Sequence, residues 1–313
     1  MPTLPKCLLL PIDGTRDALR PIEFITRLYP GVRDINMILS YFMPRLPPIY
    51  SSMSAESPEV MKKRREVLAA REKETRHVFA EARKVLIEAG ITEGLIQEHV
   101  QQKEMTVAKH SCLLADTRKV DAILVQKRVS SSLEGFLRGD SPSSLLQHCL
   151  ASPIWFTEGE IEAGNAAVCI YSEPASLRVA DHAAYMLSDT ATAITLLHVS
   201  KSISNSITCS YSEARDKLAV WSSSTAGLEV MPFLEKSAKI IMENGVEQDR
   251  IRVAVIPQRG DPAAEILSWC TANRTGIIGL GHSEPEGIWS FLKASVTRRI
   301  LSEFKHMAVW VTQ

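Results

Sequence analysis

The first set of residues in this 313-residue chain that is suited to bind a ligand lies in one stretch near its end. A short apolar run, residues 277–280, has the length of a buried strand and is closed by Gly281. After a polar loop, Ala294, Ser295 and Val296 open a helical pattern. Backbone N–H groups at a helix start lack a partner within the helix and lie at the positive end of its dipole. This order of strand, glycine loop and hydroxyl residue predicts an anion site, such as one for phosphate.

The side chains around this loop leave two interpretations open. Ser295 fits a phosphate contact, and it also fits a plain N-cap of the helix that follows. His282, directly after the glycine, is either a phosphate ligand or an ordinary loop histidine. Glu284 and Glu286 would repel an anion, and the Gly-Lys-Ser/Thr of a Walker A loop is absent. The loop is therefore a candidate phosphate site without a standard nucleotide motif.

The first half of the chain carries a second set of candidates. Asp13 ends an apolar strand pattern, residues 7–12. Gly139, Asp140 and Ser141 precede another helical pattern, as Ala294 and Ser295 do. A carboxylate at a helix start accepts the free N–H groups itself and repels phosphate, by about 1 kcal/mol at 4 Å in water. We therefore expect Asp140 to cap its helix, which leaves Gly139 and Ser141 as the candidates for ligand contact.

The sequence shows no catalytic or metal-binding constellation. Neither a nucleophile elbow nor a metal-ligand spacing occurs among its eight histidines and 36 acidic residues. The six cysteines, at positions 7, 112, 149, 169, 209 and 270, include no Cys-x-x-Cys pair. Their scatter is typical of buried thiols in a reducing cytoplasm, so neither disulfides nor zinc are expected.

Charge and hydropathy exclude further classes of partner. The net charge is zero, which gives no general argument for nucleic acid binding. A run of four cations at 62–65 lies in a helical pattern, where a solvated helix face is favoured over a nucleic-acid patch. No apolar stretch approaches the roughly 20 residues of a membrane span, and the N-terminal apolar run is too short for a secretory signal. We expect a cytoplasmic protein without membrane contact.

The elements that must hold these residues alternate between strands and helices. Such alternation predicts parallel βαβ units with right-handed crossovers, hence an α/β fold. The stretch 200–212 is expected to be a loop, and the helical region after it to be interrupted near Gly227 and Pro232. Residues 157–165 are polar and acidic, as a linker would be. The expected strands are 7–12, 35–42, 95–100, 120–125, 153–157, 167–171, 193–199, 251–256, 277–280 and 308–312.

The pattern repeats once along the chain. The segments 153–157, Pro-Ile-Trp-Phe-Thr, and 308–312, Ala-Val-Trp-Val-Thr, are 155 residues apart (308 − 153). Leu145-Leu146 and Ile300-Leu301 have the same spacing. Two copies of one plan explain the length better than one large domain. We expect domains at 1–158 and 159–313.

Together, these motifs resemble the universal stress protein family over almost the whole chain. The family's loop, Gly-x2-Gly-x9-Gly-Ser/Thr, falls on Gly281, Glu284, Ala294 and Ser295 and matches at its first and last positions. Ile-Thr-Leu-Leu-His-Val at 194–199, Gly-Asp-Pro-Ala-Ala-Glu-Ile-Leu at 260–267, and the strand ending Asp-Gly-Thr at 13–15 are similar to family segments. The resemblance implies two tandem domains of the adenine nucleotide alpha hydrolase-like type. Each would hold a five-stranded parallel sheet of order 3-2-1-4-5 with helices on both faces.

The resemblance also implies where a nucleotide would lie, at the carboxyl ends of strands 1 and 4 of a domain. In the first half, Asp13 matches the family's acidic residue at the nucleoside end, although an Asx turn is an equal alternative. In the second half, Tyr171 replaces that acid and could fill the adenine space, while Gly281 and Ser295 keep the phosphate end. Each half therefore keeps one end of the pocket.

The function implied is that of a stress-response regulator that binds an adenine nucleotide, ATP or AMP, weakly, with its phosphates over Gly281 and Ser295. The alternative is a tandem scaffold that acts through protein–protein contacts or another small ligand. ATP hydrolysis is a third reading, but no base or magnesium ligand marks it. The apolar last strands, 154–157 and 309–312, are expected to pair with each other within one chain, because free strand edges aggregate. A homodimer is a further expectation.

Overall fold

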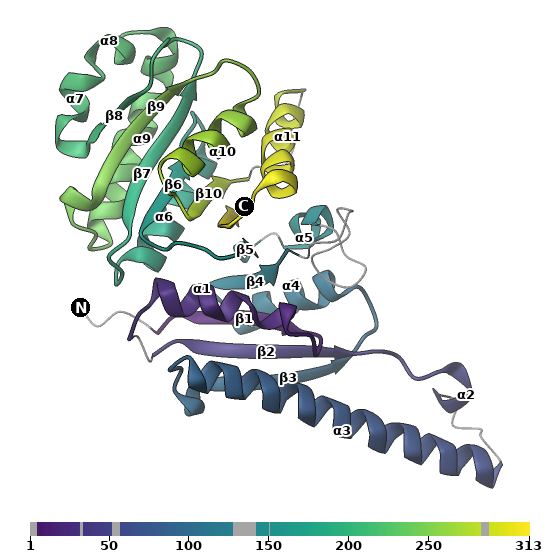
Figure 1. Ribbon diagram of the computed structural model, residues 1–313. Helices are drawn as coiled ribbons and strands as arrows, with labels where there is room; N and C mark the ends of the chain where they lie inside the picture. Colours follow the sequence, from purple (N-terminus) through teal and green to yellow (C-terminus); the bar gives the residue numbers. More distant parts are fainter. Residues whose placement is uncertain (1–4, 32–33, 52–56, 128–141, 150, 283–287) are drawn as a thin grey trace.

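The computed structural model describes residues 5–31, 34–51, 57–127, 142–149, 151–282 and 288–313. Its centre is one continuous sheet in the order β3-β2-β1-β4-β5-β11-β10-β6-β7-β9-β8 (Figure 1). The strands are β1 Cys7–Ile12, β2 Asn36–Met43, β3 Ile96–Gln102, β4 Ala122–Gln126, β5 Ile154–Glu158, β6 Asn165–Cys169, β7 Ala193–Ser200, β8 Ile207–Ser210, β9 Ile251–Pro257, β10 Ile277–Gly281 and β11 Met307–Thr312.

The order of the strands repeats in the two halves of the chain. Counted within each half, and leaving out the extra strand β8 of the second half, β3-β2-β1-β4-β5 and β9-β7-β6-β10-β11 are both 3-2-1-4-5, with parallel pairing throughout. The predicted α/β fold with two tandem units is confirmed. One expectation for the second half was wrong: the stretch 200–212 is not only a loop, because β8 lies within it and pairs antiparallel with β9.

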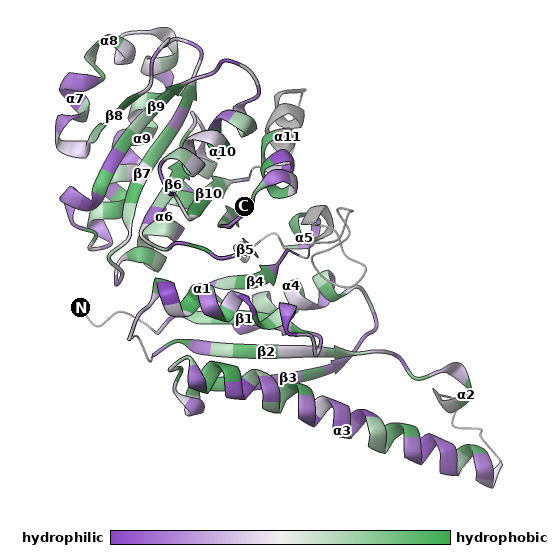
Figure 2. Ribbon diagram, viewed as in Figure 1, coloured by the Kyte–Doolittle hydropathy of each residue, from purple (hydrophilic) through white to green (hydrophobic). Residues whose placement is uncertain are grey.

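Helices cover both faces of this sheet. Residues of α1, α3, α6 and α9 belong to one buried apolar cluster, and residues of α4, α5, α10 and α11 belong to another on the opposite face. Figure 2 shows central strands of the sheet, such as β4, β7, β9 and β10, as mostly hydrophobic. The helices are α1 Pro21–Leu28, α2 Pro48–Ser51, α3 Pro58–Glu88, α4 Val107–Arg118, α5 Pro142–His148, α6 Pro174–Leu187, α7 Ala214–Lys217, α8 Ala219–Ser222, α9 Thr225–Glu243, α10 Pro262–Ala272 and α11 Ile288–Glu303.

The two halves join through their last strands. The two segments expected to meet, β5 and β11, pair antiparallel, with Trp155 opposite Trp310. The two indole rings stack with centroids 3.9 Å apart, and both side chains are fully buried. Because this is an antiparallel join between parallel sets, the strands of one half run opposite to those of the other. The carboxyl ends of the two sets therefore lie at opposite edges of the sheet, and the two candidate sites cannot combine.

Two further local expectations are corrected by the structure. The helical region of the second half is broken before Thr225, between α8 and α9, and α9 then continues through Pro232. Ser224 caps α9 by accepting a hydrogen bond from the Gly227 N–H (3.1 Å), so that glycine lies in the first turn. Cys112 and Cys149 form a disulfide, although only free thiols were expected. Within the described part of the chain, no helix is long and apolar enough to cross a membrane.

Candidate functional site

Each half has one pair of neighbouring strands whose following connections run to opposite sides of that pair in the sheet. In the first half this is between β1 and β4, and in the second it is between β6 and β10. Ligands of open α/β sheets bind in the crevice at the carboxyl ends of such strands, because the connecting segments diverge there. Asp13 follows β1 at the first of these places, and Gly281 ends β10 at the second.

In the second half, the ends of the two strands are tied together by a side chain. Tyr171 follows β6, and its hydroxyl donates a short hydrogen bond to the carbonyl oxygen of Gly281, the last residue of β10. The Tyr171 backbone is fixed as well. Its N–H donates to Ser176 Oγ (2.9 Å), and its carbonyl accepts from the same hydroxyl (2.7 Å). The tyrosine thus spans the place where a nucleoside would lie in this half.

Gly281 is glycine for a packing reason. A β-carbon built on it would lie 2.3 Å from the carbonyl oxygen of Ala175 and 2.9 Å from the Ala175 β-carbon. Ala175 is in the first turn of α6 and is fully buried. The end of β10 therefore approaches the backbone of α6, and only a residue without a side chain fits between them. The sequence pattern suggested that the Gly281 backbone approaches a phosphate. In the structure, the atoms close to Gly281 are those of Ala175.

A substitution separates these two roles of the glycine. Gly281→Ala is expected to lower the free energy of unfolding by about 2 kcal/mol, because the added methyl overlaps backbone that cannot move away cheaply. Urea unfolding curves give this value directly. Gly260→Ala is the matched control, because nothing lies within 4 Å of a β-carbon at that position. A Gly281→Ala protein as stable as the control would contradict the packing role.

The helix predicted to begin at Ala294 and Ser295 begins earlier. Helix α11 spans Ile288–Glu303, so both residues lie within it and its start is six residues before Ala294 (294 − 288). Val296 packs against the apolar cluster on that face of the sheet. His282 continues the strand pairing, since its N–H donates to the Thr312 carbonyl (2.6 Å). Gly281 and Ser295 therefore do not form the predicted loop with a helix start at the hydroxyl residue.

In the first half, Asp13 stands at the end of β1 and forms a turn. Its Oδ1 accepts hydrogen bonds from the Thr15 N–H (3.0 Å) and the Thr15 hydroxyl (2.6 Å). Gly14 between them has a φ of +83°, in the left-handed region that favours glycine. Asp13 therefore forms the Asx turn that was one of its two expected roles. The other candidates of this half, Gly139 and Ser141, and the cap residue Asp140 lie outside the described residues.

A groove opens beside the turn at Asp13. It has a volume of about 580 Å³, and its lining includes Gly14 and Thr15 after β1. Arg16 and Arg20 line one side, and side chains of α3, such as His77 and Lys84, line the other.

The residues at the end of β4 form hydrogen bonds with neighbouring side chains and carbonyls. Gln126 Oε1 accepts a hydrogen bond from the Thr157 hydroxyl (2.8 Å). Lys127 Nζ donates to the carbonyls of Ser302 (2.8 Å) and Phe304 (3.1 Å) at the end of α11, and lies 4.4 Å from the Phe304 ring centroid. Burial lowers the pKa of Lys127. Sequence reasoning missed this contact, because its partners lie about 175 residues away in the chain.

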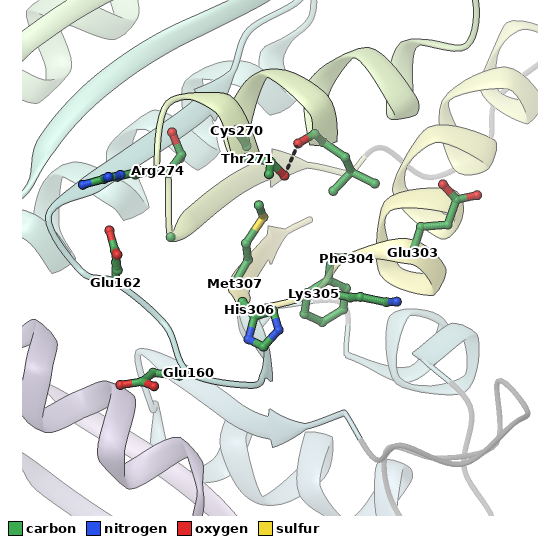
Figure 3. A pocket seen from close by; sticks show the side chains of 13 residues that line it. Glu160, Glu162, Cys270, Thr271, Arg274, Glu303, Phe304, Lys305, His306 and Met307 are labelled. Carbon is green, nitrogen blue, oxygen red and sulfur yellow. Dashed lines mark hydrogen bonds between the residues drawn. The ribbon is translucent and has the colours of Figure 1, made fainter.

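A separate pocket lies at the opposite end of the second half's strands. Its volume is about 440 Å³, and it is formed around the amino ends of β10 and β11 and the last turns of α10 and α11 (Figure 3). Figure 3 shows acidic Glu160, Glu162 and Glu303 and basic Arg274 and Lys305 around it. Glu160 already pairs with Arg27 (2.7 Å). Because it is at the amino ends of the strands, this pocket is not the predicted nucleotide site.

The titratable groups give little support for catalysis. Burial raises the pKa of the Cys169 thiol to about 12, so it is not a nucleophile near neutral pH. Burial also lowers the pKa of His198, whose Nδ1 lies 2.8 Å from the Ile170 carbonyl. Among the residues with described positions, no group of three His, Cys, Asp or Glu side chains could hold a metal ion.

Comparison with known proteins identifies the fold. No family model matches the sequence, and no curated protein matches it. A universal stress protein of Archaeoglobus fulgidus DSM 4304 has a similar structure, with a TM-score of 0.58 and 13% identity, covering 98% of this chain and 96% of that one. A structure described as a universal stress protein from Pseudomonas aeruginosa UCBPP-PA14 has a TM-score of 0.53 at 13% identity, covering 98% and 92%.

A protein of unknown function from Pseudomonas aeruginosa PAO1 is similar to the same extent. Its TM-score is 0.51 at 12% identity, and the match covers 98% of this chain and 92% of that chain. These matches run the full length of the chain, through both halves and the antiparallel join between β5 and β11. The protein therefore has the fold of a universal stress protein with two units in tandem.

Proposed function

We propose that this protein is a cytoplasmic, non-enzymatic stress-response regulator made of two units, 1–158 and 159–313, which differ in their use. The first unit binds the nucleoside part of ATP or AMP weakly at the end of β1, beside Asp13. The second unit is structural. The observation that carries this division is the hydrogen bond from Tyr171 to Gly281, which spans the second site, whereas Asp13 stands at the equivalent place in the first.

The proposed binding site differs from the one predicted from the sequence, where the phosphates lie over Gly281 and Ser295. Gly281 is packed against α6, and Ser295 lies within α11, and both positions argue against the role expected for them in phosphate binding. In the first unit, Asp140 adds a negative charge to the segment after β4. Recognition through Asp13 would therefore depend on the adenosine part of the ligand. Adenosine, AMP and ATP are expected to bind within about threefold of one another, since phosphate contacts contribute little.

Calorimetric titration with AMP tests the role of Asp13. Asp13→Asn is expected to weaken binding about tenfold, or about 1.4 kcal/mol, because a charged acceptor is replaced by a neutral one. The asparagine can still form the turn with Thr15, so the fold is retained. Tyr171→Phe removes the hydroxyl of the second unit and should leave the affinity unchanged. Equal affinity in wild type and Asp13→Asn, with a loss in Tyr171→Phe, would place the ligand in the second unit and contradict the proposal.

A further inference from the structure

The two outer edges of the sheet are not alike. At the edge of the second half, β8 covers β9 in antiparallel pairing, with Ile207 opposite Val255 and Cys209 opposite Val253. At the edge of the first half, β3 is the last strand of the described sheet, where it pairs with β2 alone. Most of its side chains are exposed. Its outer backbone groups can therefore hydrogen-bond to another strand.

The internal repeat shows where a strand paired with the outer edge of β3 would lie, because the equivalent strand β9 is paired with β8. Met37 of β2 is opposite Ile96, and Ile194 of β7 is opposite Ile251, so β3 and β9 are equivalent with a spacing of 155 (251 − 96). Val100 of the first half then corresponds to Val255 of the second. Val255 is fully buried where β9 pairs with β8, and its partner Ile207 packs against the same apolar cluster as Val255. Val100, in contrast, is 42% exposed.

A groove lies where the counterpart of Ile207 would be. It has a volume of about 370 Å³ beside Val100, between the end of β3 and α3, and is mostly apolar. Its other lining residues include Met43, Leu46, Leu68 and Thr75. In the second half, the connection from β7 to α9 supplies β8 and so fills this space from within the chain. The groove is large enough to take an aliphatic side chain.

The corresponding connection in the first half is held away from the edge. Arg71 of α3 donates to the carbonyls of Pro44 (2.6 Å) and Arg45 (2.9 Å), and Arg45 donates to the carbonyls of Lys103 (3.1 Å) and Glu104 (2.7 Å). Prolines at 44, 47 and 48 lack an N–H group for strand pairing. Among the described residues, no segment of the chain pairs with the outer side of β3. Its occupant would come from another molecule.

Helix α3 indicates the charge of that occupant. It has 31 residues, or about 46 Å, and its amino-terminal part projects beyond the carboxyl end of β3 (Figure 1). This part carries exposed Lys62, Lys63 and Arg65, and Figure 2 shows it as largely hydrophilic. A strand antiparallel to β3 begins at the carboxyl end of β3. The residues that precede it would pass beside these cations, where acidic side chains are favoured.

We propose that the outer edge of β3 is a docking site for an extended, acidic segment of a partner protein. The segment would pair antiparallel with β3, as β8 pairs with β9. It would place an aliphatic side chain in the groove beside Val100 and acidic residues, amino-terminal to that side chain, beside Lys62, Lys63 and Arg65. The polar side chains of β3 limit pairing with unrelated strands, so the groove and the cations supply the specificity.

A displayed library of random 12-residue peptides, selected on the full chain, tests the site. We expect selected clones to carry acidic residues followed by alternating aliphatic residues. Val100→Asp, at a half-exposed position, should weaken their binding at least tenfold, because it places a carboxylate in the groove. The triple reversal Lys62→Glu, Lys63→Glu and Arg65→Glu should weaken it similarly, and more so at low salt. Val220→Asp, at a 91% exposed position of α8, is the matched control and should bind as wild type.

Two results would overturn this inference. The first is the absence of any clone that distinguishes wild type from Val100→Asp in a selection that yields binders elsewhere on the protein. The second is a dimer in sedimentation velocity that Val100→Asp converts to monomer, which would assign the edge to a second copy of this chain. Circular dichroism spectra and urea midpoints of both variants should match those of Val220→Asp. AMP titration is independent of this edge, so either proposal can fail alone.

Discussion

Reduction of the disulfide between Cys112 and Cys149 is expected to lower the free energy of unfolding by about 3 to 4 kcal/mol. The bond joins α4 to the residue after α5 and closes a loop of 37 residues. Such a cross-link restricts the unfolded chain by roughly this amount. Urea unfolding with and without dithiothreitol measures the loss. The double variant Cys112→Ala, Cys149→Ala should be less stable and should not respond to the reductant.

The state of the thiols provides the control for this experiment. Cys7, Cys169, Cys209 and Cys270 are free in the structure. Mass spectrometry after alkylation of the denatured, unreduced protein should therefore find four modified cysteines, and six after reduction. Cys7→Ser, a half-buried change elsewhere, should retain the response to dithiothreitol. Six modified cysteines in the unreduced protein, or equal stability in both buffers, would contradict the structure at this point.

Acid is expected to destabilise the join between the two halves through His182. The Trp155 indole N–H donates to His182 Nε2 (2.9 Å), and the imidazole edge faces both Trp155 and Trp310. Burial lowers the pKa of His182 to about 3. The unfolded chain, with a pKa near 6.5, then binds the proton first, so stability falls as the pH drops from 6.5 towards 3.

The size of this effect follows from the shift in pKa. For a completely buried His182, the free energy of unfolding would fall by about 3 kcal/mol between pH 7.5 and pH 4. Because the side chain is partly exposed, we expect a loss of about 2 kcal/mol. His182→Gln keeps an acceptor for Trp155 and removes the titration. The loss of stability on acidification should be smaller in this variant by that amount, whereas His77→Gln, an exposed change on α3, should follow wild type. Equal losses in wild type and His182→Gln would exclude this role for His182.

Much of the fold could be predicted from the sequence because it depends on local patterns. Apolar runs such as Ile277–Leu280 are short and fully buried, so they mark strands of a parallel sheet. The spacing of 155 residues between the two last strands marked the repeat. Their apolar character on both faces also indicated that they must be covered, and each is the neighbour of the other.

The rest depends on contacts between residues far apart in the chain. Strand β8 is short and polar in sequence, and its pairing with β9 is what makes it a strand. Cys112 and Cys149 meet only because α4 and α5 pack together. Gly281 matches a phosphate loop in sequence, but its neighbour Ala175 is about 106 positions earlier (281 − 175) and decides its role. Patterns of glycine and hydroxyl residues therefore point to the ends of these strands without showing which atoms pack there.

Photolabelling with 8-azido-ATP tests whether the nucleotide binds beside Asp13 in the first unit. The full chain is irradiated with the analogue, with and without excess AMP, and the labelled peptides are identified by mass spectrometry. We expect AMP-protected label in the first unit, on peptides near Asp13, and a marked reduction of that label in Asp13→Asn. Protected label on peptides that contain Tyr171 or residues 281–296 would contradict the account, because it would show the second site open and occupied.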